Sequence, residues 1–73
     1  MKIELAEVVR EFEEFGITFL AGQILMGEFS PVGMSDSMFI FPVTVKDREF
    51  KTEHISVYMS DKKLIPVLEN MVV

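Results

Sequence analysis

The spacing of apolar residues changes near residue 16, from a helical repeat to short apolar runs separated by polar turns. In residues 3–15 apolar side chains recur at intervals of three and four positions, with glutamates between them, which is the repeat of an amphipathic helix. Gly16 follows where a left-handed C-cap would end this helix. We therefore predict a helix over residues 3–15, while residues 2–5 by themselves also alternate as a short strand would. The apolar face of the helix would comprise Leu5, Val8, Val9, Phe12 and Phe15.

Residues 17–29 are apolar on both faces of whichever element they form, and they contain Gly22 and Gly27. Because glycine is a poor helix residue, a buried strand with a bulge or bend near Gly22 is the preferred interpretation. A helix is the open alternative, because the spacing of Leu20 and Ile24 also fits a repeat of 3.6 residues.

Polar residues divide the second half of the chain into short segments. Residues 30–37 (SPVGMSDS) have the composition of a loop, and residues 38–45 (MFIFPVTV) have that of a strand. Pro42 has no amide hydrogen to donate, so we expect it at a sheet edge or a bulge. The polar residues 46–49 then predict the turn of a hairpin whose second strand is residues 50–59.

Residues 60–63 (SDKK) predict a second polar turn. Residues 64–73 predict a further strand, or alternatively a short helix with Pro66 in its first turn. The predicted fold class is therefore α+β, with one N-terminal amphipathic helix packed on a small, mostly antiparallel sheet of three to four strands. The expected core residues are Val8, Phe12, Phe19, Phe41, Ile55 and Val57.

The chain has 73 residues, which is enough for a single domain over residues 1–73. Hydrophobic residues make up 49% of it, too many for a disordered segment and more than the interior of so small a domain can hold. We therefore expect another chain to cover some of these side chains, either a second copy in a homo-oligomer or a different protein.

The net charge of −5 comes from 12 acidic and 7 basic residues. This sign repels nucleic-acid phosphates and anionic membrane surfaces, so neither is expected as a direct partner. The chain has no cysteine, which excludes disulfides, thiolate metal sites and a cysteine nucleophile. Its longest uncharged run, residues 15–27, is shorter than the ~20 residues of a membrane-spanning helix and follows acidic residues, unlike a signal peptide. We expect a soluble, cytoplasmic protein.

Candidate catalytic groups are few. His54 is the only histidine, so one chain cannot form a histidine dyad or a multi-histidine metal site. A cluster in the predicted loop supplies the other residue types of a hydrolase triad, but no nucleophile elbow is present, and turn formation explains the cluster. We therefore assign no catalytic residue, cofactor or metal. The cluster consists of Ser30, Ser35, Asp36 and Ser37.

Four glutamates would form a stripe beside the apolar face of the predicted helix. Each like-charged pair three or four positions apart costs a helix about 0.2–0.5 kcal/mol, and the glutamates near the C-terminal end also oppose the helix dipole. A feature that opposes folding suggests docking to a basic partner, whereas a solvated acidic face is the simpler interpretation. Methionine in a loop is a second kind of candidate contact. The candidate partner-binding residues are Glu4, Glu7, Glu11, Glu14 and Met34.

No motif in the chain identifies a family. The sequence best fits a non-enzymatic, acidic protein–protein interaction module. It would act as a homo-oligomer, or as a small subunit or inhibitor bound to a larger protein, for example a basic, nucleic-acid-binding one. The alternative is a small ligand-binding protein or enzyme whose pocket forms between subunits, with His54, Tyr58 and the loop serines as its polar groups.

Overall fold

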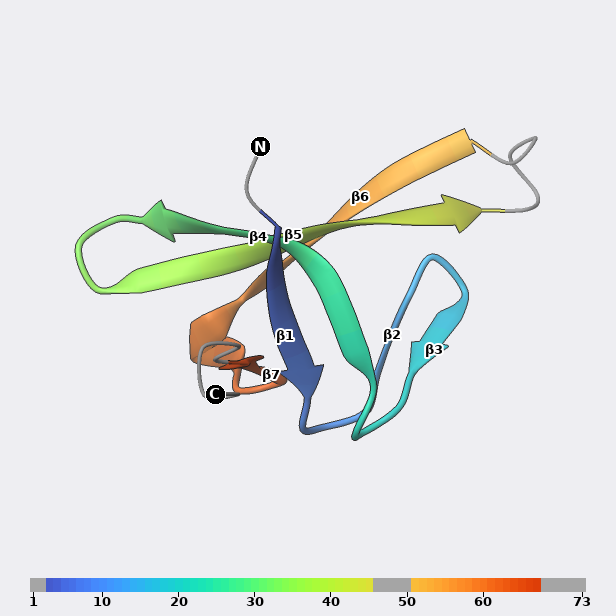
Figure 1. Ribbon diagram of the computed structural model, residues 1–73, viewed down its shortest axis with the longest axis horizontal. Coiled ribbons are helices and arrows are strands. Elements are labelled where there is room, and N and C mark those ends of the chain that lie inside the picture. The colour runs from blue at the N-terminus through green and yellow to red at the C-terminus, as the bar shows by residue number, and fades with distance from the viewer. Residues whose placement is uncertain (1–2, 46–50, 68–73) are drawn as a thin grey trace, which may run out of the picture.

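The computed structural model describes residues 3–45 and 51–67, which form an all-β structure (Figure 1). Five strands form an antiparallel sheet in the order β6-β5-β4-β1-β7, and β2 and β3 form a separate hairpin. The described residues contain no α-helix, so the predicted α+β class is wrong. The elements are β1 (Glu4–Val8), β2 (Phe12–Glu14), β3 (Ile17–Phe19), β4 (Ile24–Val32), β5 (Asp36–Val45), β6 (Lys51–Tyr58), the 3₁₀ helix η2 (Met59–Asp61) and β7 (Leu64–Val67).

The segment predicted as a helix forms β1, a short connection and β2. β1 lies between β4 and β7, and its alternation buries Ala6 and Val8, while Val9 and Phe15 farther along are exposed. β-Branched and aromatic residues are frequent in this segment and favour strands. An extended backbone also separates glutamates that would repel one another on a helix. Two neighbouring strands supply hydrogen bonds to β1 on both sides, which the local periodicity does not reveal.

The left-handed glycine predicted at position 16 is present, but it lies in a hairpin turn. Phe15 and Gly16 have φ angles of 52° and 73°, and they connect β2 to β3 between the paired residues Glu14 and Ile17. A two-residue turn with positive φ at both positions is the type I′ turn, whose twist suits a hairpin. The same local feature therefore closes a hairpin in place of ending a helix.

The prediction of strand over residues 17–29 is confirmed in part. β3 and the first six residues of β4 lie in this range, on either side of a turn at Gly22, whose φ is 97°. The range therefore holds two strands and no helix. The loop predicted over residues 30–37 is wrong for most of its length, because β4 and β5 pair through it and leave a turn only at residues 33–35.

β5, β6 and β7 confirm the strands predicted in the second half of the chain. Pro42 of β5 pairs with His54 of β6, whereas the pairing of β5 with β4 ends at Ile40. Pro42 therefore has a strand on one side only, which is the edge position expected for a residue without an amide hydrogen. The turn predicted over residues 46–49 and the end of the last predicted segment, residues 68–73, lie outside the described residues.

The turn predicted over residues 60–63 is confirmed as the region where β6 passes into β7. The 3₁₀ helix η2 ends at Asp61, and its C-cap Lys62 has a left-handed φ of 61°. Arg10 holds this region from the other side, because its guanidinium donates a hydrogen bond of 2.7 Å to the Asp61 carbonyl oxygen. The connection between β1 and β2 is thereby fastened to η2.

β4 joins the β1–β7 part of the sheet to the β5–β6 part, and it bends at Gly27. It pairs with β1 as far as Gly27 and with β5 from Glu28 onward, and Figure 1 shows β5 and β6 running across the direction of β1. A Cβ at position 27 would collide with the carbonyl oxygen of Ile40 and would lie 2.9 Å from Cβ of Phe41. Glycine permits this close approach, and the bend wraps the sheet around one core.

The hydrophobic core lies inside the bent sheet and under the β2–β3 hairpin. All six predicted core residues are buried, so this prediction is confirmed. Phe12 stacks on Phe19 with 4.9 Å between ring centroids, and Phe19 meets Phe41 edge to face at 5.5 Å. These ring contacts hold the hairpin against the sheet. The buried cluster comprises Ala6, Val8, Phe12, Phe19, Leu25, Phe39, Phe41, Ile55, Val57 and Leu64.

Candidate functional site

The structure separates the four glutamates that were predicted to form one stripe. Glu4 is half-buried, and its Oε1 accepts a hydrogen bond of 3.0 Å from the Phe29 amide, just past the bend in β4. This carboxylate therefore stabilises the corner of the sheet. Glu11 lies in the connection before β2 and Glu14 lies in β2, and both are exposed. The stripe is wrong as a geometry, because it required a helix.

Glu7, the remaining member of the group, lies on the outer face of the part of the sheet formed by β7, β1 and β4. Residues directly opposite each other on paired antiparallel strands point to the same face. Ile24, Met26 and Ile65 on this face are exposed by 50%, 63% and 46%. We call the six residues of this face the outer patch. They form two rows across the strands, Met26–Leu5–Val67 and Ile24–Glu7–Ile65.

The opposite face of these three strands carries core residues, among them Ala6, Leu25 and Leu64. An antiparallel sheet with one face in the core normally presents polar side chains on its other face. Here five of the six residues of the outer patch are apolar. A contiguous exposed apolar surface on a small protein is typical of an interaction site.

Glu7 occupies the centre of one row of the outer patch. Its direct cross-strand neighbours are Ile24 and Ile65, and the Cβ atoms of residues paired in this way lie ~4.5–5.5 Å apart. Glu7 is half-buried, and its carboxylate makes no hydrogen bond or ion pair with the described residues. The side chain therefore loses part of its hydration without gaining a counter-ion, which is unfavourable for a charged group.

A pocket of about 370 Å³ adjoins the outer patch at Met26, beside the bend in β4. Most of its lining is apolar, and its polar side chains are Glu28 and His54. His54 is exposed on β6, as are Thr52 and Ser56, which alternate with the buried Ile55 and Val57. The lining residues are Ile3, Met26, Gly27, Glu28, Ile40, Pro42 and His54.

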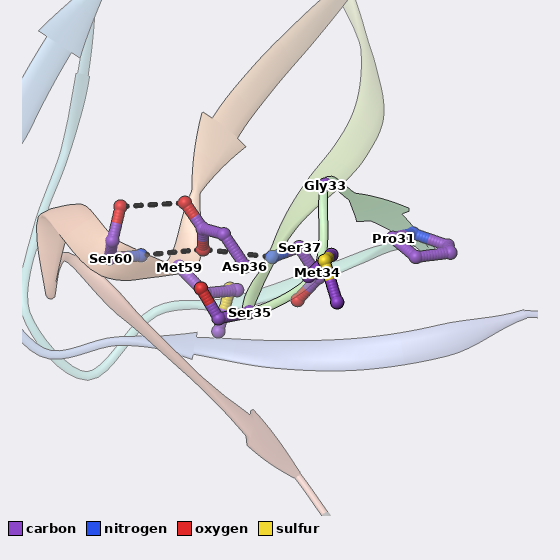
Figure 2. Close-up of a pocket in the computed structure, with 8 residues that line it drawn as sticks. All are labelled: Pro31, Gly33, Met34, Ser35, Asp36, Ser37, Met59 and Ser60. Carbon is purple, nitrogen blue, oxygen red and sulfur yellow. Dashed lines mark hydrogen bonds between the residues drawn. The ribbon is translucent and has the colours of Figure 1, made fainter.

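Figure 2 shows a second pocket, of about 440 Å³, where the β4–β5 turn meets η2. Its carboxylate, Asp36, accepts hydrogen bonds from the Ser60 hydroxyl (2.8 Å), the Ser37 amide (2.8 Å) and the Ser60 amide (3.2 Å). The Ser60 hydroxyl first, and then the Ser37 amide, hold the pKa of Asp36 below its ordinary value of 3.8. Asp36 therefore fastens the hairpin turn to η2 and is a poor proton acceptor near neutral pH.

The residue types of the hydrolase triad do not come together. Asp36 is the first residue of β5, whereas His54 lies opposite Pro42, six positions farther along that strand. Six residues of strand span ~20 Å, so Asp36 cannot orient His54. Among residues 3–45 and 51–67, no three histidine, aspartate or glutamate side chains are grouped to hold a metal ion. This part of the chain also contains no helix long and apolar enough to cross a membrane.

Met34, the fifth candidate contact, is fully exposed at the tip of the β4–β5 hairpin. It lines the second pocket and does not belong to the outer patch. Sequence reasoning missed the apolar members of the outer patch. A signal was present in residues 17–29, which are apolar on both faces, and such a run predicts a strand that is covered on both sides. Residues 3–45 and 51–67 cover only one side of β4 there.

Comparison with models of protein families, with curated protein sequences and with solved structures finds no match for this chain.

Proposed function

We propose that this protein is a non-enzymatic protein–protein interaction module that binds its partner through the outer patch. The observation that carries the proposal is the half-exposed apolar surface on the side of β7, β1 and β4 that faces away from the core. Burying such side chains against a partner contributes ~25 cal/mol per Å² of apolar surface removed from water. The 370 Å³ pocket beside Met26 extends the same surface toward β5 and β6.

The alternative of a ligand-binding or catalytic pocket between subunits has weaker support. Its polar groups diverge, because His54 lines the pocket beside the outer patch whereas Ser35 and Ser37 lie beside Asp36 in the other pocket. The one carboxylate among those serines already accepts three hydrogen bonds. A catalytic site needs groups that converge on one substrate atom.

Site-specific photo-cross-linking tests the proposal. A diazirine amino acid placed at position 24 or 65 should give one defined adduct in the cells that make the protein, with the partner or with a second copy. The same amino acid at position 13, exposed in β2, is the control and should give no adduct. Equal labelling from all three positions, or no adduct from positions 24 and 65, would contradict an interaction through the outer patch.

A further inference from the structure

We propose that the outer patch binds an amphipathic helix of another protein whose apolar face carries one arginine or lysine, and that this cation pairs with Glu7. The inference rests on the proposed function and specifies the chemistry of the partner. Glu7 is half-buried between Ile24 and Ile65, and its carboxylate has no counter-ion or hydrogen bond among the described residues. A cation delivered into apolar surroundings would satisfy this carboxylate where water is partly excluded.

Charge complementarity distinguishes this occupant from a second copy of the chain. The outer patch contains a carboxylate and no lysine or arginine. A two-fold contact centred on the patch would bring two Glu7 carboxylates together in an apolar setting, which is costly without cations. Among the described residues, Lys63 lies two positions before Ile65 in the chain, but its Nζ lies over the Phe12 ring, 5.3 Å from the ring centroid, and makes no ion pair with Glu7. His54 lies on β6, three strands from β1 in the sheet order, which is ~14 Å along the sheet.

The dimensions of the patch favour a helix lying on the face over a strand added at the edge. Three neighbouring strands span ~10 Å from β7 to β4, which matches the ~10–12 Å diameter of an α-helix with its side chains. The edge strand β7 has four residues and includes Pro66. A short edge with proline is a poor template for an added strand.

Two synthetic helical peptides of identical composition test the inference. In the first, a single arginine lies at the centre of a leucine face. In the second, that arginine exchanges places with a glutamine on the polar face, so the net charge is unchanged. Binding is measured by fluorescence anisotropy, and its location by NMR shifts of the Ile24, Met26 and Ile65 methyl groups, with Met34 as the distant exposed methyl.

The wild-type protein should bind the first peptide about tenfold more tightly than the second, a ratio that corresponds to about 1.4 kcal/mol. Glu7→Gln should reduce this preference to about twofold or less, because the neutral amide keeps the shape of the side chain and loses the charge. Glu13→Gln removes one exposed charge from β2 and should leave the preference unchanged. Urea denaturation of each variant checks that it is folded.

The possible outcomes separate this inference from the proposed function. Equal binding of both peptides at the outer-patch methyl groups would overturn the inference and leave the proposed function standing. A preference that survives in Glu7→Gln would also overturn it. A two-chain mass in sedimentation equilibrium, with broadening of the same methyl signals, would assign the patch to a second copy. Absence of any shift and of any mass increase would overturn the inference, whereas the proposed function is overturned only if positions 24 and 65 also give no cross-linked adduct.

Discussion

Gly27 lies so close to the backbone of Ile40 that a Cβ at position 27 would collide with the Ile40 carbonyl oxygen. The strand β4 changes its pairing partner from β1 to β5 at this point. The close approach therefore sets the corner at which the sheet folds over its core. The colliding atom is a backbone carbonyl, which cannot move aside as the end of a flexible side chain could.

Gly27→Ala should destabilise the protein by about 3 kcal/mol or more, because the added methyl group overpacks a backbone contact. Gly16→Ala is the control: nothing lies within 4 Å of a Cβ there, and its φ is 73°. The free energy of unfolding of this control should fall by only ~1–2 kcal/mol, which is the cost of placing a residue with a Cβ in the left-handed conformation. Urea denaturation measures both, and equal losses would contradict the close approach at the corner.

Phe12→Ala should lower the free energy of unfolding by about 3–5 kcal/mol through lost burial and a residual cavity. Phe12 stacks on Phe19, and the pair joins the β2–β3 hairpin to Phe41 of the sheet. Phe15→Ala at the exposed tip of the same hairpin should cost about 1 kcal/mol or less. Thermal denaturation of the two variants compares them, and a small loss in Phe12→Ala would show that the hairpin does not pack on the core.

Asp36 should make the protein sensitive to acid. The pKa of Asp36 is lowered in the folded state, chiefly by the Ser60 hydroxyl. The charged Asp36 therefore stabilises the fold fully at pH values above its ordinary pKa of 3.8. This stabilisation is lost as the pH falls through the lower pKa that Asp36 has in the folded protein. Asp36→Asn should be less stable than the wild type at pH 7, and the difference should shrink at low pH.

Urea denaturation across the acid range measures the effect of Asp36→Asn, and an NMR titration follows the Asp36 carboxyl directly. Ser60→Ala is the matched variant, because it removes the hydroxyl that donates a hydrogen bond of 2.8 Å to Asp36 Oδ2. In this variant the pKa of Asp36 should rise toward its ordinary value. A stability difference between wild type and Asp36→Asn that is constant with pH would contradict this account.

Glu7→Val should raise the free energy of unfolding by about 0.5–1 kcal/mol, because valine favours strands and packs against its cross-strand neighbours Ile24 and Ile65. It should also increase binding of the apolar dye ANS, since the outer patch becomes uninterrupted. Glu13→Val on the exposed β2 lacks those neighbours and should change both measurements less. A loss of stability in Glu7→Val would show that the carboxylate has a structural role.

The core could be predicted from sequence because large apolar side chains are buried in whichever element carries them. Phe12 illustrates this: it was assigned to the buried face of a helix and lies buried in a strand. The second half of the chain was also predictable, because alternation and polar turns mark strands locally. Residues 3–15 were not predictable in this way, because their apolar positions fit a helical repeat while β4 and β7, which pair with β1, are distant in sequence.

The candidate site required the pairing register. Glu7 was singled out from the sequence as one of four helix glutamates, whereas its position between Ile24 and Ile65 depends on three segments meeting across the sheet. Glu4 was assigned to the same stripe, yet its carboxylate accepts a hydrogen bond from Phe29 at the corner. Which side of a strand faces solvent follows from what the rest of the chain covers, and no local pattern contains that information.

The sequence by itself determined the size and acidic charge of the chain, its principal core side chains and the left-handed conformation of Gly16, because these depend on composition and local backbone preferences. Only the tertiary structure decided that residues 4–8 are a strand, that β4 turns a corner at Gly27, and that an apolar face surrounds Glu7. Hydrogen bonds in a sheet join residues far apart in the chain. The conformation of each strand and the exposure of its two faces therefore follow from partners that its own sequence does not specify.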